Sequence, residues 1–397
     1  MQRIYLDHNA TTPVHPAALE AILPYFGAEF GNPSSAHHFG QRARQAIEHA
    51  REAVAALIGA RSTEIVFTSG GTEADNAAIF GVVEHAARTR GKSAGAAPHV
   101  ITTAIEHDAV LKTCRALEQR GVSVTYVPVG ADGVVSADAI RAALRPETVL
   151  ISVMRANNEI GTLQPIEEIG AVAAEADILL HTDAVQSAGK VPIDVNRLRV
   201  DLLSLSAHKF YGPKGIGALY IRKGTEVDPF VHGGANERGR RAGTENVAAI
   251  VGLGKAAELA RAELAEISAH FGELRDRLEQ GLLARVAGAR LNGDATRRVP
   301  NTSNLMLPGV ESESLVIALD LAGLACSAGA ACSSGAVDPS HVLTAIGLTA
   351  AEARASVRFS VGRMNTREEI DRALEIIPAA VARQCGVASN REVAAAQ

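Results

Sequence analysis

The residues best suited to chemistry lie in segment 204–217, where Lys209 follows a pattern that alternates apolar and polar residues. The alternation predicts a strand, so Lys209 would stand just beyond the end of that strand. A lysine amine is a nucleophile only when neutral, which requires burial or nearby polar and cationic groups. Ser206 and His208 lie close enough to supply such groups and to hydrogen-bond an anion. A lysine before Gly-Pro also fits an ordinary exposed turn, so other motifs must decide.

A carboxylate and an amide follow the preceding predicted strand. Residues 176–183 form a short apolar run that ends in Asp183, and Gln186 lies just beyond it. Functional groups of α/β enzymes gather at the carboxyl ends of parallel strands. Pyridoxal phosphate enzymes bind the cofactor to a lysine as a Schiff base and place a carboxylate against the ring nitrogen, and Lys209 with Asp183 fits that pair. Asp183 could equally cap a helix that begins near residue 184.

Three further predicted strand ends carry groups suited to the same cofactor. A strand over 64–68 precedes a Ser-Gly-Gly-Thr turn and a helix, whose N-terminus and glycine N–H groups suit a phosphate. The turn has neither the Walker nor the dinucleotide-binding glycine pattern, and an ordinary strand-to-helix turn is the alternative. His107 follows the next strand and could stack on a ring, and Asn158 follows the one after. Polar groups at five strand ends favour one shared cofactor site.

The chain resembles, over nearly its whole length, the cysteine desulfurases, which are fold type I pyridoxal phosphate enzymes of the class V aminotransferase-like group. The stretches that carry the resemblance are residues 5–13, 30–34, 68–73, 106–107, 157–161, 181–186, 208–215, 237–246 and 358–360. Three of these motifs, Asp-His-Asn-Ala-Thr-Thr, Thr-Asp-Ala-Val-Gln and Arg-Ala-Gly-Thr-Glu-Asn, are most similar to the nitrogen-fixation-type (NifS/IscS-like) subgroup. Housekeeping members share much of this pattern.

The resemblance implies the α/β fold of a type I transferase, with a mostly parallel sheet in a large domain and a smaller α+β domain. The large, cofactor-binding domain would span 16–256, and the alternation of predicted strands and helices there also indicates a mostly parallel α/β domain. The smaller domain would combine an N-terminal arm, 1–15, with 257–397. It would include a long helix over 256–284 and a catalytic-cysteine loop at about 324–340.

The resemblance also implies a role for each candidate residue. Lys209 would hold pyridoxal 5'-phosphate and, once released, move the substrate α-proton, while His107 would stack on the ring and transfer a proton. The substrate carboxylate of L-cysteine would bind Arg358, helped by Asn158 and Asn9. No metal is expected. The remaining cofactor contacts would come from Gly71, Thr72, Asn158, Asp183, Gln186, Ser206 and His208, and from Thr244 of a second subunit.

Cys332 fits the nucleophile motif of the family, Ser/Ala-Cys-x-Ser-x-x-x-Glu/Asp-Pro-Ser. Small residues surround it, and a segment rich in Gly, Ala and Ser has little conformational stiffness. The resemblance implies that the Cys332 thiolate attacks the substrate sulfur and becomes a persulfide as alanine is released. Only a small fraction of an ordinary thiol is ionised at neutral pH, so the thiol must be activated. A small buried apolar residue is the alternative interpretation.

The other cysteines are predicted to be structural. Cys326 departs from the family pattern, which has a small residue without a thiol there. It could pair with Cys332, but it follows the apolar run 315–321, which favours a core residue in a strand. Cys114 and Cys385 lie in helical patterns. Four cysteines without zinc-site spacing, and no apolar signal segment at the first residues, indicate a reducing cytoplasm.

Composition and charge exclude several classes of function. A net charge of −5 and a pI near 6.2 argue against a nucleic-acid surface. The sequence is 47% apolar, enough for a core, yet contains no run that predicts a membrane span.

We expect a homodimer that passes sulfur to an iron–sulfur scaffold or another acceptor protein. A selenocysteine lyase or aminotransferase of the same fold stays open, as does a persulfide-carrying scaffold without turnover.

Overall fold

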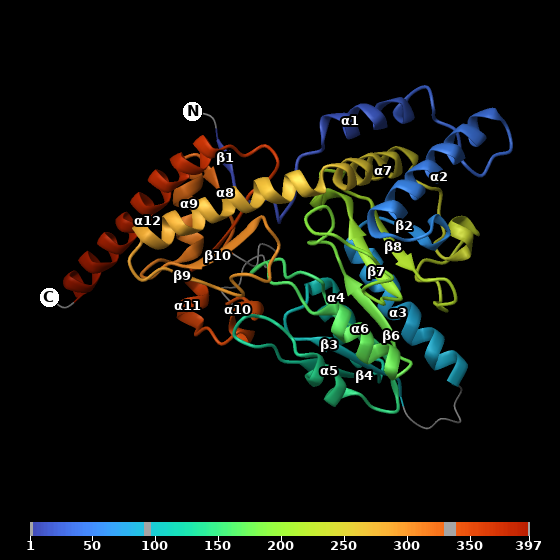
Figure 1. Cartoon of the computed structure of the whole chain (residues 1–397), viewed down its shortest axis with the longest axis horizontal. Helices are drawn as coiled ribbons and strands as arrows, with labels where there is room; N and C mark the ends of the chain where they lie inside the picture. The colour runs from blue at the N-terminus through green and yellow to red at the C-terminus, as the bar shows by residue number, and fades with distance from the viewer. Residues whose placement is uncertain (1–2, 91–96, 329–338, 396–397) are drawn as a thin grey trace.

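The computed structural model describes residues 3–90, 97–328 and 339–395. Its elements form two groups that lie side by side, a larger one around a central sheet and a smaller one that holds the C-terminal helix (Figure 1). The helices α7 (Val247–Ala262) and α8 (Leu264–Arg285) follow one another across both groups. The N-terminal arm begins in the smaller group, where β1 (Ile4–Tyr5) pairs with β11 (Leu324–Ala325).

The central sheet has seven strands and is mostly parallel, as predicted. Strands β3 to β7 pair in parallel, whereas β8 is antiparallel to both of its neighbours. These strands are short, and all except the edge strand over 123–127 are almost entirely buried, as expected for a sheet covered on both faces. Their order across the sheet is β2 (Ile65–Thr68), β8 (Gly217–Ile221), β7 (Leu202–Ser206), β6 (Leu179–Asp183), β5 (Thr148–Ser152), β3 (His99–Thr103) and β4 (Ser123–Val127).

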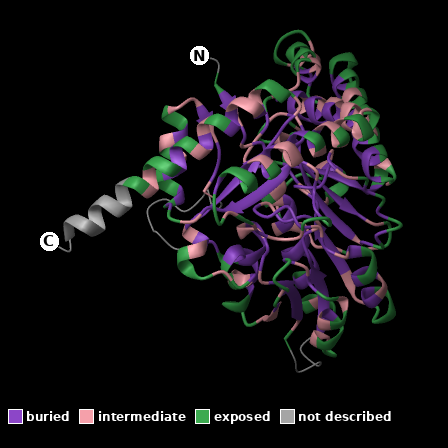
Figure 2. Ribbon diagram, turned by 60° about the vertical axis from the view of Figure 1, so that its left-hand side comes forward, coloured by how far each residue is buried: buried purple, intermediate pink, exposed green. Residues whose placement is uncertain are grey.

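Helices cover both faces of the sheet and leave its strands buried (Figure 2). One face packs on α3 and α4, and the other on α2, α5, α6 and α7. The alternation within a strand explains this, since Val100 faces the first layer and Ile101 the second. The helices are α1 (Pro16–Ile22), α2 (His38–Ile58), α3 (Gly71–Arg90), α4 (Asp108–Glu118), α5 (Ala137–Ala143) and α6 (Ile166–Glu175).

The smaller group has its own core. Ile4 and Leu6 of the arm pack there with apolar residues of α8, α9, α12 and three strands. Its elements are β9 (Arg290–Leu291), β10 (Thr302–Met306) and β12 (Ser356–Ser360), which form one antiparallel sheet, and α9 (Ser312–Leu321), α10 (His341–Ala345), α11 (Ala350–Arg354) and α12 (Arg367–Ala395). Short 3-10 helices lie at Leu23–Phe26, Ser62–Glu64, Ala207–Lys209 and Asn236–Gly239.

One local prediction was wrong. The long helix expected over 256–284 is broken at Glu263, between α7 and α8, so the expected domain boundary at 256/257 falls inside α7. At the break, the Glu263 carboxylate forms an ion pair with Arg363. A contact with such a distant residue cannot be predicted from the local sequence. The apolar run 315–321 lies in the helix Ser312–Leu321. The domain limits 1–15, 16–256 and 257–397 stay a prediction.

Cys326 follows strand β11 and is buried in the core of the smaller group, as expected for a structural residue. Cys114 and Cys385 lie in α4 and α12, also as expected. Cys332 lies outside the described residues. Within the described ranges, none of the helices combines the length and apolarity that a membrane span requires.

Candidate active site

The polar residues predicted at strand ends meet at one edge of the central sheet. Strands β3, β5, β6 and β7 run parallel to one another, so their carboxyl ends share this edge, and β2 ends there as well. Loops after these strands form a small apolar cluster with α10, in which Ile105, Met154 and Ile160 contact Val342 and Leu343. The edge is thus fixed from both groups of elements, as a ligand site between them requires.

Lys209 stands in the 3-10 turn that follows β7, and its amine reaches the N-terminal arm. Its Nζ donates to the carbonyl oxygens of Asn9 at 2.6 Å and Ala10 at 2.8 Å. Two residues later, Tyr211 has a φ of 68°, a left-handed conformation that is costly for a bulky residue. The Tyr211 N–H donates to the hydroxyl of Thr12 at 2.8 Å, which holds this turn against the arm.

Asp183 ends β6 beside Lys209 and is almost fully buried. Its Oδ1 accepts a hydrogen bond from the Val185 N–H at 2.8 Å. The residues after it form turns, so Asp183 does not cap a helix. Burial raises the pKa of the Asp183 carboxyl, and the charges of His107 and Lys209 act against this rise. A protonated ring nitrogen placed here would favour the ionised carboxylate in the same way.

His107 is the N-cap of α4, and this position explains its tautomer. Its Nδ1 accepts a hydrogen bond from the Ala109 N–H at 3.1 Å, so the proton of a neutral ring must be on Nε2. The imidazole is therefore anchored on one side and can donate on the other. Its charged form acts on Asp183, which places both side chains in the same part of the site.

Two further carboxyl groups lie behind Asp183, and sequence reasoning missed both. Burial and the charge of Asp183 raise the pKa of Asp75 well above its usual range, and burial raises the pKa of Glu106 to about 8. His181 is fully buried between the hydroxyls of Ser152 and Ser204, at 2.9 and 3.0 Å, and burial lowers its pKa to about 3. Burial therefore favours the neutral forms of Asp75, Glu106 and His181.

The glycine turn before α3 forms a cradle next to Ser206. A Cβ on Gly71 would lie 2.8 Å from Cγ2 of Val185 and 3.5 Å from Cβ of Ser206, so only glycine fits without displacement. Thr72 is exposed in the first turn of α3. The helix N-terminus, backbone N–H groups and hydroxyls are the groups that bind a phosphate.

His208 lies in the 3-10 turn that follows Ser206. Its Nδ1 lies 3.1 Å from the hydroxyl of Thr11. Burial, with the charges of Lys209, Lys214 and Lys190, lowers the pKa of His208 to about 4. The ring is therefore a neutral hydrogen-bonding group rather than a cation at neutral pH.

Arg358 lies in β12 of the smaller group and is almost fully buried. Its Nη1 donates to the Asn158 carbonyl at 2.9 Å, and its Nη2 donates to Asp7 Oδ1 at 2.8 Å. Its Nε is buried without a hydrogen-bond partner among the described residues. Each terminal nitrogen carries a second N–H, so the guanidinium keeps donors for a carboxylate. Asp7 was missed by sequence reasoning, although it stands two residues before Asn9 in a matching motif.

Asn9 joins both groups of elements. Its amide nitrogen donates to the Asn158 carbonyl at 3.1 Å and to the hydroxyl of Thr302 at 2.8 Å. Its own carbonyl accepts from Gln186 Nε2 at 2.9 Å as well as from Lys209. The predicted residues Asn9, Asn158, Gln186, Lys209 and Arg358 are thus brought together by one hydrogen-bond network.

Thr244 lies apart from this network in the single chain. It is exposed and borders a cavity of about 190 Å³ that Ser69 and Gly215 also line. Glu73, in the first turn of α3, pairs with Arg241 of the same loop at 2.9 Å. The loop that carries Thr244 is therefore attached to the turn that forms the cradle.

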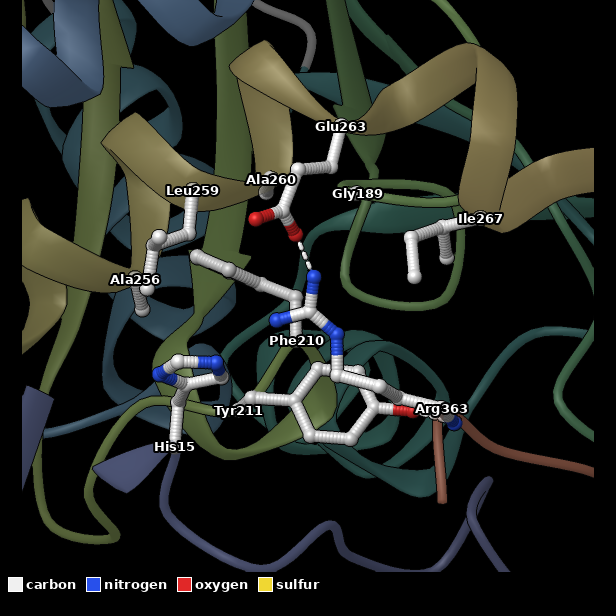
Figure 3. A pocket seen from close by; sticks show the side chains of 10 residues that line it. All are labelled: His15, Gly189, Phe210, Tyr211, Ala256, Leu259, Ala260, Glu263, Ile267 and Arg363. Carbon is white, nitrogen blue, oxygen red and sulfur yellow. Dashed lines mark hydrogen bonds and ion pairs between the residues drawn. The ribbon is translucent and has the colours of Figure 1, made fainter. Parts of the chain in front are cut away.

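A second, smaller pocket lies between α7, α8 and the segments after β6 and β7 (Figure 3). Arg363 pairs with Glu263 at one side, and its guanidinium lies 5.9 Å from the centre of the Tyr211 ring. The volume of about 20 Å³ is close to that of one water molecule, so this pocket cannot hold a cofactor.

The fold and the pair formed by Lys209 and Asp183 define a fold type I pyridoxal phosphate enzyme. The family model described as aminotransferase class-V matches residues 4–373, and the chain belongs to this family. The cofactor is therefore pyridoxal phosphate, and the predicted family and fold are confirmed.

Relatives with known names cover almost the whole chain. A protein named cysteine desulfurase IscS from Methanosarcina thermophila is 53% identical over 375 residues, which are 94% of this chain and 91% of the relative. A solved NifS-like protein superimposes with a TM-score of 0.88 at 39% identity and covers 96% of this chain and 100% of its own. A structure of SspA in complex with cysteine has a TM-score of 0.79 at 40% identity and covers 91% and 100%.

The residues of this chain fit the cofactor. The Gly71 cradle leaves room that a Cβ would fill, Lys209 offers an amine, and Asp183 is a buried carboxylate close to both Lys209 and His107. These are the phosphate, aldehyde and ring-nitrogen partners that pyridoxal phosphate requires.

Proposed function

We propose that this protein is a cysteine desulfurase that converts L-cysteine to L-alanine and transfers the sulfur to Cys332 as a persulfide. The observation that carries the proposal is the network in which Lys209, Asn9 and Arg358 meet beside the glycine cradle. Relatives named cysteine desulfurase that match over more than nine tenths of both chains support the choice of reaction.

The cofactor contacts come from five strand ends. Lys209 would hold the cofactor through its aldehyde group, Asp183 would serve the ring nitrogen, and His107 would stack on the ring, with its Nε2–H available to move a proton. Gln186 and Asn158 donate to the ring substituents. The phosphate is held by Gly71, Thr72, Ser206 and His208 of this chain and by Thr244 of a second subunit.

The substrate carboxylate binds Arg358. The guanidinium is buried and already oriented by Asp7 and the Asn158 carbonyl, so binding does not have to order it. Its remaining N–H groups form a bidentate pair with the carboxylate. Asn9 and Asn158 border the same position and help to exclude water.

Sulfur transfer uses a thiol of the chain. Pyridoxal phosphate supplies an electron sink for the electron pairs released at the substrate carbons. Lys209 moves the α-proton, and the Cys332 thiolate then attacks the substrate sulfur. An S–S bond forms as the Cβ–S bond breaks, and the electron pair of the broken bond stays with carbon until a proton completes the methyl group of alanine.

The active unit is a homodimer. Leu19, Leu23, Phe26, Phe30 and Phe39, which we call the apolar patch, are between 48% and 73% exposed around α1 and the start of α2. The rings of Phe30 and Phe39 stack with their centres 5.4 Å apart. Clustered exposed aromatic residues mark association surfaces, and a second copy that covers the apolar patch would bring a partner loop with Thr244 to the cradle.

Sedimentation tests the homodimer. A double variant, Phe26→Ser with Phe30→Ser, should be a monomer that binds the cofactor weakly. Leu321→Ser removes an apolar side chain that is 83% exposed on α9, outside the apolar patch, and should stay dimeric. A wild-type protein that is a fully active monomer at nanomolar concentration would contradict the shared site.

The persulfide sulfur goes to an acceptor protein in the cytoplasm. An iron–sulfur scaffold is the acceptor we propose, with nitrogenase cluster assembly, tRNA thiolation or DNA phosphorothioation as other destinations of the same sulfur. Binding assays between the persulfide form and each class of acceptor, followed by transfer of labelled sulfur, distinguish them.

Product analysis tests the reaction itself. The enzyme should form alanine from L-cysteine in amounts equal to the sulfur transferred. Selenide release from selenocysteine with little alanine from L-cysteine would instead indicate a selenocysteine lyase. Amino-group transfer to a keto acid would indicate an aminotransferase, and a protein without the visible absorbance of bound cofactor would indicate a scaffold.

A further inference from the structure

Lys190 is a second lysine at the site, this one buried, and sequence reasoning gave it no role. It is 3% exposed, and its Nζ donates to Gln186 Oε1 at 2.8 Å and to Asn9 Oδ1 at 3.4 Å. In the part of the chain that the structure describes, no carboxylate forms an ion pair with it. A buried cation without such a partner is costly, so a purely structural role would be better served by an apolar side chain.

The backbone brings Lys190 close to Lys209. Gly189 and Phe210, which adjoin the two lysines in sequence, line the same small pocket (Figure 3). A Cβ on Gly189 would lie only 2.9 Å from Cβ of Phe210, and the φ of Gly189 is 70°. Glycine therefore permits an approach that other residues would prevent. The hydroxyl of Ser268 in α8 donates to the Lys190 carbonyl at 2.6 Å and anchors the segment.

Asn9 and Gln186 connect the two amines. Lys209 donates to the carbonyl of Asn9, and Lys190 donates to its side-chain oxygen. The Lys190 amine also donates a hydrogen bond to Gln186 Oε1. The other end of that amide, Nε2, therefore donates to the Asn9 carbonyl. Lys190 thus fixes the orientation of the Gln186 amide. Both lysines donate to Asn9, Lys190 to its side chain and Lys209 to its backbone carbonyl.

We propose that Lys190 is a positioning residue that favours the neutral amine of Lys209 through their shared contacts with Asn9 and Gln186. The inference rests on the proposed role of Lys209 as the lysine that binds the cofactor. Two amines in one buried network titrate as a pair, and a proton on one disfavours a proton on the other. A neighbouring cationic group is a known means of making a lysine nucleophilic.

The charges around the two amines act on both lysines. Burial, then the charges of Lys209 and Arg358, keep the pKa of Lys190 well below its usual value. His8, in the arm, has its pKa lowered to about 4 by burial and by Lys190. The charges of both lysines act on His208, and the carboxylate that interacts with Lys209 is that of Asp183. The titratable groups around Lys190 are therefore cations and neutral rings, whereas the Asp183 carboxylate interacts with Lys209.

A pH titration of the holoenzyme tests the proposal. The absorbance of the bound cofactor changes when the nitrogen that it shares with Lys209 gains a proton. Lys190→Met removes the neighbouring amine and the proton that it can carry, so the midpoint of this titration should rise by about one pH unit. Lys190→Arg keeps the cation and should stay close to wild type. Lys190→Gln is a second neutral variant and should shift in the same direction as Lys190→Met.

Lys255→Met is the matched control, because Lys255 lies partly exposed on α7 and pairs with Glu258 at 2.9 Å, away from the network. It should leave the midpoint unchanged. Borohydride reduction and peptide mapping of each holoenzyme test the role of Lys209 separately from the role of Lys190. A label on Lys209 with the same midpoint in Lys190→Met, Lys190→Gln and wild type would overturn the role of Lys190 alone. A label on Lys190 would overturn both this role and that of Lys209.

Discussion

Gly71→Ala is the substitution whose effect follows most directly from the geometry of the cradle. The new methyl group would lie 2.8 Å from Cγ2 of Val185, inside the distance at which two carbon atoms can meet. Val185 cannot move freely, because its N–H holds Asp183 Oδ1 at 2.8 Å. Relief must therefore come from the turn of Gly71 and Thr72, which the phosphate of the cofactor would fix.

The expected magnitude follows from the size of the overlap. Overpacking by one methyl group costs about 1–3 kcal/mol, which corresponds to a loss of roughly 5- to 150-fold in the binding constant for pyridoxal phosphate. The cofactor-free protein can relax the turn, so its stability should fall less than its affinity. Titration of cofactor-free enzyme with pyridoxal phosphate, followed by absorbance, measures the affinity, and urea unfolding measures the stability.

Gly272→Ala provides the control. Gly272 lies in α8, where a Cβ would meet nothing within 4 Å. Alanine is the better helix former, so this variant should gain up to about 1 kcal/mol of stability and bind the cofactor as wild type does. A folded Gly71→Ala variant with cofactor affinity within twofold of wild type would refute the assignment of this turn to the phosphate.

Three other substitutions separate the roles of site and core. Lys209→Ala should fold but carry no borohydride-stable label on peptide mapping, and a label elsewhere would show that another lysine binds the cofactor. Cys326→Ala should cost roughly 1 kcal/mol or less in urea unfolding and should still produce alanine. Glu237→Gln leaves buried Arg51, 2.6 Å away, without its buried charge partner and should cost about 3 kcal/mol or more. As a control, Glu29→Gln, at an exposed ion pair, should change stability little.

The sequence was sufficient for the residues that stand at the ends of strands. Short apolar runs followed by Asp183, His107 or Lys209 are local signals, and the parallel sheet brings such ends together without further information. The glycine turn before α3 was predictable for the same reason, since the conformation of a strand–turn–helix unit is set within a few residues.

The residues that the sequence did not reveal act through contacts between distant segments. Asp7 pairs with Arg358 across 351 positions, and Lys190 reaches Asn9 across 181. Neither residue follows a predicted strand end, so periodicity and turn signals could not single it out. The break at Glu263 has the same origin, because a distant partner, Arg363, rather than a glycine or proline accompanies it.

Mass spectrometry of the enzyme after treatment with L-cysteine, in the absence of reductant, identifies the cysteine that receives the sulfur. The account predicts one added sulfur on Cys332, together with alanine in solution. It also predicts that Cys332→Ala keeps the cofactor absorbance and the dimer while alanine production falls to near background. An added sulfur on Cys326 instead, with Cys332→Ala still producing alanine, would contradict the account.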